Sequence, residues 1–302
     1  MYNTAIVLIL FAAILESLII IAGNIFTIFV FWKNRNSLKR TSCLLINLAG
    51  ADLLTGFAAL LSLGAFKIPG NLRERNFETA HDTNISIAFQ ITFSFASIFL
   101  LALISPERAY ALIWPLRHRV ASTRSYIYVA TFGWITAIFF GVLTLLAVYD
   151  LLDFSYWIVA IGCVKILCVI TVCVSYLLIR TRLTSRASTI DGSYYRQNEQ
   201  QQNAKVSRTL FIVITASLSF WSLSIVVFCT HYLCYKSIPI FLIQIFNLFS
   251  LANSLVNPII YSFRIPMFKK IFRKTKLCKR LKRYIVNFIV YIARILGNQA
   301  CK

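Results

Sequence analysis

A carboxylate lies in the middle of an apolar stretch that is long enough to cross a membrane. Asp52 is central in this stretch, and a lone negative charge in a membrane is costly unless it has partners. The candidate partners are polar residues in other apolar stretches, namely Asn24, Ser97, Asn253 and Asn257. A carboxylate ringed by neutral oxygen atoms suits a small hard cation or water molecules. A polar cluster that only holds helices together is the alternative interpretation.

A pair of opposite charges stands at the end of the third apolar stretch. Glu107 and Arg108 are adjacent there, and Ala109 follows them. A charge-assisted pair of this kind can open when a better partner arrives, so it suits a switch. Two charges that simply end a membrane segment are the alternative interpretation.

A proline lies inside the last long apolar stretch. Pro258 removes one backbone hydrogen bond, and in a membrane the freed carbonyl group needs another donor. The nearest polar residues in the sequence are Asn253, Ser254 and Asn257. The stretch ends at Tyr261, and Arg264 follows. The pattern predicts a kinked helix that stops at a basic membrane face.

The elements that hold these residues are membrane helices. Of the 302 residues, 59% are hydrophobic and only 14% are charged, which is typical of a membrane protein and not of a soluble domain. Seven stretches are long enough to span the hydrocarbon core. They cover residues 5–32, 42–66, 85–106, 125–149, 156–179, 208–230 and 238–262. The sequence therefore predicts an all-α membrane protein with a seven-helix bundle.

The basic residues predict the orientation of the bundle. They gather in the first, third and fifth connections and after Tyr261, while the other connections hold few. The positive-inside rule then places the N-terminus outside and the C-terminus in the cytoplasm, as expected at the plasma membrane. The net charge of +21 becomes a property of the cytoplasmic face. It favours membrane lipids and an acidic protein partner over nucleic acid.

Three sequence features indicate covalent modification. Asn84 begins an Asn-X-Ser sequon on the outer side, and Cys229 and Cys234 flank the last outer connection and could form a disulfide. Cys278 follows a basic amphipathic stretch and is a candidate for palmitoylation.

The ordered set of polar, aromatic and proline residues resembles the class A, rhodopsin-like G-protein-coupled receptors. The likeness covers residues 5–273. We take residues 1–273 as the receptor domain with its eighth helix and residues 274–302 as a basic cytoplasmic tail. The residues that match the family's hallmark of a span are Asn24, Asp52, Arg108, Trp134 and Pro258. In the fifth and sixth spans, Tyr176 and Trp221 stand near a missing proline.

This resemblance implies roles for individual residues. A sodium pocket would consist of Asp52, Ser97, Trp221, Asn253 and Asn257. The residues for coupling to a heterotrimeric G protein and for switching would be Glu107, Arg108, Tyr176, Pro258 and Tyr261. A short amphipathic eighth helix would follow from Phe263 to Phe272, with Phe268 and Phe272 toward lipid.

The departures from the family pattern favour one part of it. Cys168 and Leu223 replace the prolines of the fifth and sixth spans, and Thr83-Asn84 stands where a cysteine is expected. These features look like the melanocortin, lipid and adenosine receptor cluster. Phe228 and Leu251, however, occupy the positions of the amide and the histidine expected for adenosine recognition.

The one basic residue buried in a span points to a ligand pocket. Lys165 lies 11 residues before Tyr176, which is close to three helical turns, so both should share the inward face. The other candidate lining residues are Gln90, Ser94, Trp221, Ser224, Phe228 and Asn247. Such a pocket has one cationic anchor and suits a small anionic or lipid-like ligand, with a peptide or a nucleoside as alternatives. A lysine that reaches the membrane surface or loses its proton is the structural alternative.

Other function classes fit the sequence less well. A transporter or pore is the alternative to a receptor, but we find no internal repeat and no paired broken helices of the kind that build transport sites. An enzyme is disfavoured because the three histidines, His81, His118 and His231, lie in or beside connections. No nucleophile has a base near it in the sequence.

Overall fold

The computed structural model of the chain describes residues 2–34, 41–64, 77–120, 122–187 and 240–265, with single positions between 212 and 220 and at 268 and 271. The described elements are helices: α1 (Tyr2–Lys33), α2 (Thr41–Gly64), α3 (Phe77–Ile113), α4 (Pro115–Val120), α5 (Thr123–Val148), α6 (Phe154–Ala187) and α8 (Ile240–Arg264). Six of the seven predicted spans correspond to these helices. The predicted span 208–230 lies almost entirely outside the described residues.

Five of the described helices carry apolar segments long enough to cross a membrane. These segments are Val7–Lys33, Cys43–Leu63, Ile85–Ile113, Arg124–Val148 and Val159–Arg182. Their large exposed hydrophobic side chains, such as Phe11, Phe132 and Leu167, face outward where lipid would solvate them. The fold is the all-α membrane bundle that the sequence predicts.

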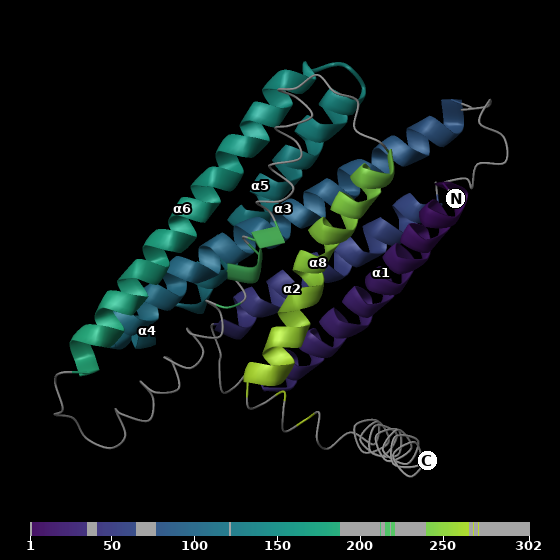
Figure 1. The fold of residues 1–302 in the computed structure, drawn as a ribbon. Helices are drawn as coiled ribbons and strands as arrows, with labels where there is room; N and C mark the ends of the chain where they lie inside the picture. The colour runs from purple at the N-terminus through teal and green to yellow at the C-terminus, as the bar shows by residue number, and fades with distance from the viewer. Residues whose placement is uncertain are drawn as a thin grey trace, which may run out of the picture.

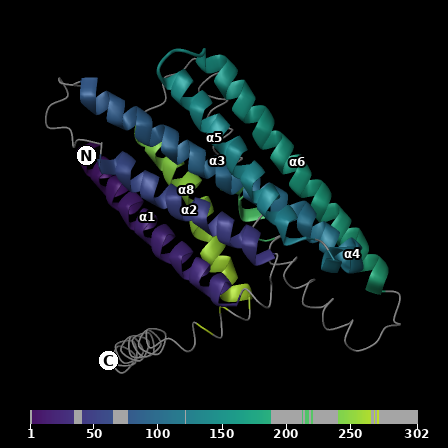
Figure 2. The same ribbon diagram turned by 180° about the vertical axis from the view of Figure 1, so that it is seen from behind.

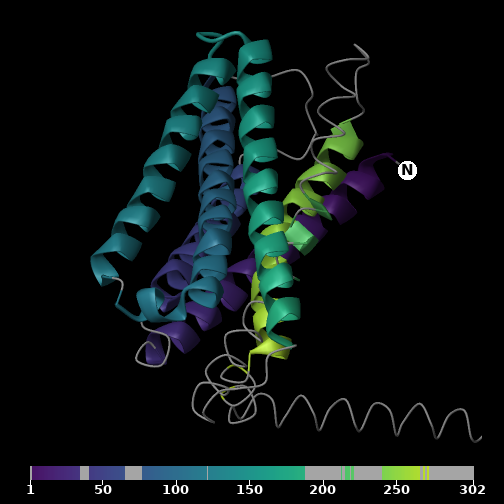
Figure 3. The same cartoon turned by 90° about the vertical axis from the view of Figure 1, so that its left-hand side faces the viewer.

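The helix α3 is the central element of the bundle. It packs against α2, α5 and α6, and also against the short α4, and it runs through the middle of the molecule in Figures 1 and 2. The helix α8 packs against α1 and α2. In the same two views α1 and α6 lie on opposite sides of α3, and Figure 3 shows α5 and α6 close at one end and diverging toward the other, with α3 between them.

Small residues allow α3 and α5 to approach closely. A Cβ atom added at Gly141 of α5 would overlap the side chain of Thr92 on α3, and one at Gly133 would lie 3.3 Å from Leu103. Without such a Cβ the apolar core closes around buried side chains that include Phe95, Leu100 and Phe140. Close backbone approach at small residues is a usual way to pack helices in a membrane.

Most hydroxyl groups in the spans are satisfied by their own helix. The side chains of Ser17, Thr55, Thr92, Ser105 and Thr144 each donate to the carbonyl oxygen four residues earlier. This back-bonding removes an unsatisfied donor from the apolar interior without a second helix. Hydroxyl groups that instead donate across to another helix therefore stand out as parts of a site.

The proline kink of α8 is completed by α1. Pro258 has no N–H group, so the carbonyl oxygen of Ser254, four residues earlier, loses its helical donor. Asn24 Nδ2 donates to that oxygen at 3.2 Å. Gly23 permits the approach, because a Cβ atom there would lie 3.1 Å from Pro258 Cβ. The donor thus comes from α1 and not from the polar residues of α8 that the sequence pointed to.

An aromatic cluster joins the C-terminal ends of α1 and α8. Tyr261 and Phe268 are almost fully buried, and Phe31 meets both rings edge-on at 5.7 and 5.2 Å between centroids. The expectation that Phe268 faces lipid was wrong, because its ring packs under α1, also against Phe26 at 5.9 Å. Phe272 lies outside the described residues.

Candidate functional site

The carboxylate of Asp52 is the centre of a polar cluster buried between three helices. Asp52 on α2 has no exposed surface. Ser97 of α3 donates to its Oδ1 at 2.7 Å, and Ser254 of α8 donates to the same atom at 2.8 Å. Asn257 Nδ2 donates to Oδ2 at 2.7 Å. Ser97 and Ser254 thus direct their hydroxyl groups to another helix, unlike the back-bonded residues described above.

Several oxygen atoms of this region have no hydrogen-bond partner among the described residues. They are the Oδ1 atoms of Asn24, Asn253 and Asn257, and all three residues are buried. Asn257 belongs to the cluster through its amide nitrogen, and Asn24 is bonded to Ser254. Amide oxygens that accept no hydrogen bond are hard ligands, and they can coordinate a cation together with a carboxylate. This donor set fits a small hard cation or ordered water.

The sequence-predicted members of the cluster differ in their placement. Ser97 and Asn257 bond directly to Asp52. Asn253, four residues before Asn257, is buried but forms no hydrogen bond to that carboxylate among the described residues. Ser254, its neighbour, takes the contact instead. Trp221 lies outside the described residues.

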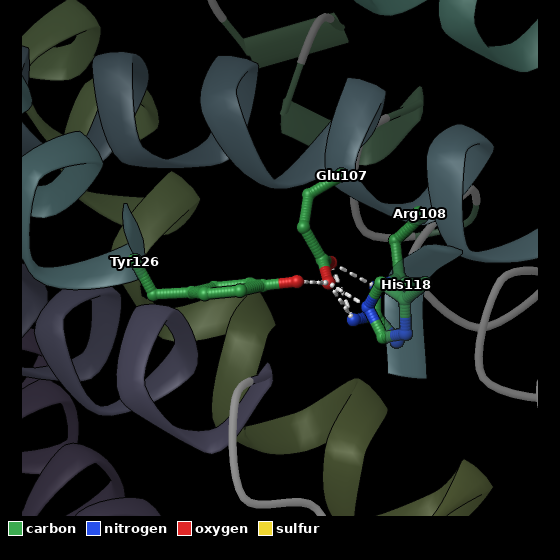
Figure 4. A network of polar contacts seen from close by, with 4 residues as sticks. All are labelled: Glu107, Arg108, His118 and Tyr126. Atoms are coloured by element: carbon green, nitrogen blue, oxygen red, sulfur yellow. Dashed lines mark hydrogen bonds and ion pairs between the residues drawn. The ribbon is translucent and has the colours of Figure 1, made fainter. Parts of the chain in front are cut away.

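A second polar cluster gathers around Glu107 near the C-terminal end of α3 (Figure 4). Arg108 forms an ion pair with the Glu107 carboxylate and donates to both of its oxygen atoms. His118 Nε2, from α4, lies 2.9 Å from Glu107 Oε1, and Tyr126 of α5 donates to the same oxygen at 3.3 Å. Both charged side chains are largely buried, with 4% of Arg108 and 10% of Glu107 exposed.

The cluster joins three consecutive helices through a single carboxylate. An ionised carboxylate only accepts hydrogen bonds, so this contact requires that the Nε2 atom of His118 carries a hydrogen atom and donates it. The rings of Tyr110 and Tyr126 flank the imidazole at 6.2 and 6.3 Å. Sequence reasoning placed His118 in a connection and gave Tyr126 no role. The only signal was Pro115, which starts the short helix that turns the chain back toward α3.

The remaining switch residues occupy separate places in the bundle. Tyr261 is 1% exposed, and its hydroxyl group has no partner among the described residues. Pro258 is buried against α1, and Tyr176 is partly buried on α6. Trp134 of α5 donates from its indole nitrogen to Asn47 Oδ1 of α2 at 3.1 Å, so this aromatic residue links two helices.

Two of the candidate ligand-pocket residues belong to α3 and one belongs to α6. Gln90 and Ser94 on α3 are partly buried, as is Lys165 on α6. The Nζ atom of Lys165 lies 5.9 Å from the ring centroid of Phe95. Asn247 on α8 is exposed. Trp221, Ser224 and Phe228 lie outside the described residues.

The candidate modification sites gain no support from the geometry. Asn84 belongs to α3, while Cys229, Cys234 and Cys278 lie outside the described residues. The described cysteines, Cys43, Cys163, Cys168 and Cys173, are free thiols. Cys168 is buried inside an unbroken α6, in keeping with the absence of the usual proline.

Comparison with known proteins defines the class. Residues 23–261 match the family described as "7 transmembrane receptor (rhodopsin family)", and the chain therefore belongs to this family of G-protein-coupled receptors. Among curated proteins, the adenosine receptor A2a of Canis lupus familiaris is 23% identical over 293 residues, which cover 84% of this chain and 68% of that receptor. The adenosine receptor A3 of the same species is 24% identical over 303 residues, with 88% and 91% covered.

Family membership settles the broad function. The protein is a multi-pass membrane receptor that signals through G proteins in response to an extracellular ligand, and it is not an enzyme. The adenosine receptors belong to one of the branches that the sequence pattern singled out.

Proposed function

We propose that this receptor lies in the plasma membrane with its N-terminus outside, and that the C-terminal end of α3 activates a heterotrimeric G protein in the cytoplasm through Arg108. The observation that carries the proposal is the closed cluster around Glu107, which holds the Arg108 guanidinium inside the bundle. The distribution of basic residues supports the orientation.

The cluster provides a physical mechanism for switching. While Glu107 accepts bonds from Arg108, His118 and Tyr126, the guanidinium is held against this carboxylate inside the bundle. Opening of the cluster frees a cation with several donors at the membrane face, where carbonyl groups of a docking helix can receive them. Ala109, next in the chain, leaves space beside it. The closed arrangement therefore corresponds to the inactive receptor.

The Asp52 cluster is the proposed site of a regulatory sodium ion. The carboxylate supplies the negative charge, and Ser97 and the unpaired amide oxygens of Asn253 and Asn257 supply neutral ligands. A bound cation would screen the charge of Asp52 and hold α2, α3 and α8 together. An ion that prefers one conformation shifts the equilibrium by its difference in affinity for the two states.

A nucleoside is not the ligand that we propose, despite the names of the relatives. Leu251 stands at the position expected for a recognition histidine and is buried against Ile20 and Ala59. Phe228 likewise replaces the expected amide. An apolar side chain at each position removes the hydrogen bonds that would read a purine ring.

The test of this proposal measures the orientation of the chain in the membrane and its coupling to a G protein. An epitope tag at the N-terminus should bind antibody on intact cells, while a C-terminal tag should require permeabilised cells. The levels of cyclic AMP or calcium should change in cells that express the wild type, and not in cells that express Arg108→Ala at an equal amount on the surface. A solute or ion current carried by the protein, with no G-protein response, would favour the transporter or pore instead.

A further inference from the structure

The helix α6 carries a partly buried lysine, Lys165, on its inner face. Its buried side chains Cys168, Val172, Ser175 and Ile179 recur at intervals of three and four residues, which defines the stripe packed on the bundle. Lys165 lies one turn before Cys168 in this stripe and approaches the Phe95 ring of α3. The ammonium group therefore points into the bundle and not toward lipid.

Among the residues that the structure describes, this ammonium group has no ionic partner. Among the described residues the two ion pairs link Glu107 to Arg108 and to His118, and Lys165 takes part in neither. The Phe95 ring offers only its negative face at 5.9 Å, which is near the limit of a cation–π contact. That ring is also stacked on Phe140, with 5.2 Å between centroids, so its other face is covered.

The sequence limits the carboxylate side chains that could pair with Lys165. The chain has ten acidic residues, and none follows Glu199. The predicted span 208–230 and the helix α8 therefore bring no negative side chain to Lys165.

The acidic residues that precede α6 or belong to the first turns of α3 are far from Lys165 along their helices. Asp153 precedes Lys165 by 12 residues, or about 18 Å of helix, and Asp150 is further away. On α3, Asp82 precedes Phe95 by 13 residues, or about 20 Å, and Glu78 comes still earlier on the same helix.

The three acidic residues inside the spans are engaged or distant. Asp52 already accepts bonds from three side chains, and Glu107 is held in its own cluster. Glu16 belongs to α1, on the opposite side of the bundle from α6 (Figures 1 and 2). Lys165 is thus a partly buried cation that has no carboxylate partner among the described residues.

We propose that Lys165 anchors the negatively charged group of the receptor's ligand, a small molecule with a carboxylate or phosphate beside an apolar or aromatic body. The charged group pairs with the ammonium between α3 and α6, and the apolar body lies along the aromatic surface that includes Phe95. A buried polar anchor in a mostly apolar pocket is the usual composition of a small-molecule site. This inference rests on the proposed receptor function and adds a ligand class to it.

Matched pairs of acidic and neutral compounds test this assignment. The purified receptor in phosphatidylcholine nanodiscs is titrated with AMP and adenosine, and with indole-3-acetate and indole-3-ethanol, while its thermal unfolding is followed. At least one acid should bind the wild type about tenfold more tightly than its neutral partner. The AMP pair reports a phosphate, and the indole pair reports a carboxylate.

Three variants separate a charge anchor from a structural role. Lys165→Met should abolish the preference for the acid, and Lys165→Arg should retain it. Lys33→Met is the matched control, because Lys33 also lies over an aromatic ring, Phe29, at 5.6 Å, and it should leave the preference unchanged. Equal binding of acid and neutral compound in both pairs, including no binding of either, would overturn the inference. So would an acid preference that survives in Lys165→Met.

Failure of this inference differs from failure of the proposed function. The same nanodiscs are assayed for guanine-nucleotide exchange on added heterotrimeric G proteins without any compound. Exchange by the wild type together with equal binding of acid and neutral compounds would remove the anion anchor and leave the receptor function intact. Absence of exchange both by the wild type and by Glu107→Gln, which removes the ion pair that holds Arg108, would instead contradict the function.

Discussion

His118 Nε2 and Glu107 Oε1 lie 2.9 Å apart, although 11 residues separate them in the chain. The contact joins the short helix α4 to α3 beside Arg108, the residue that we assign to G-protein activation. We therefore propose that the imidazole is a second latch, in the sense that its bond to Glu107 helps to keep this carboxylate paired with Arg108 inside the bundle.

Removal of that latch should raise activity in the absence of ligand. A hydrogen bond to a charged group contributes roughly 1.5–3 kcal/mol, so His118→Ala should increase basal G-protein activation about tenfold if the bond exists only in the inactive state. Tyr126→Phe, which removes a bond of 3.3 Å, should have a smaller effect. Tyr128→Phe on the exposed face of α5 is the control. Basal activity of His118→Ala at the wild-type level would show that the contact is not a latch.

Sodium should lower basal activity through Asp52. In wild-type membranes, replacement of an organic cation by sodium should reduce nucleotide exchange by roughly fivefold or more, the lower end of typical coupling between two sites. Asp52→Asn should remove the dependence on sodium. Asp150→Asn is a suitable control, because Asp150 lies outside the spans with φ of 56°, which asparagine tolerates well. An unchanged response to sodium in Asp52→Asn would contradict a cation site at this carboxylate.

Asn24 should stabilise the fold through the proline kink of α8. Asn24→Ala leaves the carbonyl oxygen of Ser254 without its side-chain donor, at a cost of about 1–2 kcal/mol, so the unfolding temperature in detergent should fall. Asn34→Ala is the matched control, since Asn34 bonds only within its own helix end, to Val30 at 2.8 Å. Equal effects of the two substitutions would mean that the contact between α1 and α8 adds nothing.

The contact between α3 and α5 should be sensitive to a single methyl group. Gly141→Ala places a Cβ atom on the Thr92 side chain and should destabilise the receptor by about 1–3 kcal/mol, the usual cost of overpacking. Gly162→Ala should be neutral or slightly stabilising, because no atom lies within 4 Å of its added Cβ. Thermal unfolding of the two variants checks the predicted direction of the change in stability for each. A Gly141→Ala protein as stable as the wild type would show that the Thr92 side chain can move aside with no loss of stability.

The sequence predicts the helices and part of each cluster for clear physical reasons. Membrane length and apolar composition define the spans, and a carboxylate buried in a span requires donors. The sequence offered Asn24, Ser97, Asn253 and Asn257, of which Ser97 and Asn257 make the bond. The choice of Ser254 over Asn253 depends on the rotation of α8 around its proline kink, which no local pattern reports. The donor for the freed carbonyl comes from Asn24 on α1, so it follows from packing alone.

Two further residues show where sequence reasoning stops. The amphipathic pattern after Phe263 marks Phe268 as apolar but does not say whether an apolar ring faces lipid or the bundle. The structure places it under Phe31. His118 belongs to a helix of six residues, too short for a periodic signal, and its direction is set by the contact with Glu107.

The central claim is that opening of the Glu107 cluster exposes Arg108 to a G protein. The most direct measurement is guanine-nucleotide exchange on purified heterotrimeric G proteins by the receptor in nanodiscs, for wild type, Glu107→Gln and Glu107→Gln/Arg108→Ala. The account predicts that Glu107→Gln exceeds the wild type because the ion pair is lost, and that the double variant returns to the level of empty nanodiscs. Full exchange by the double variant, or exchange by Glu107→Gln no greater than that of the wild type, would contradict it.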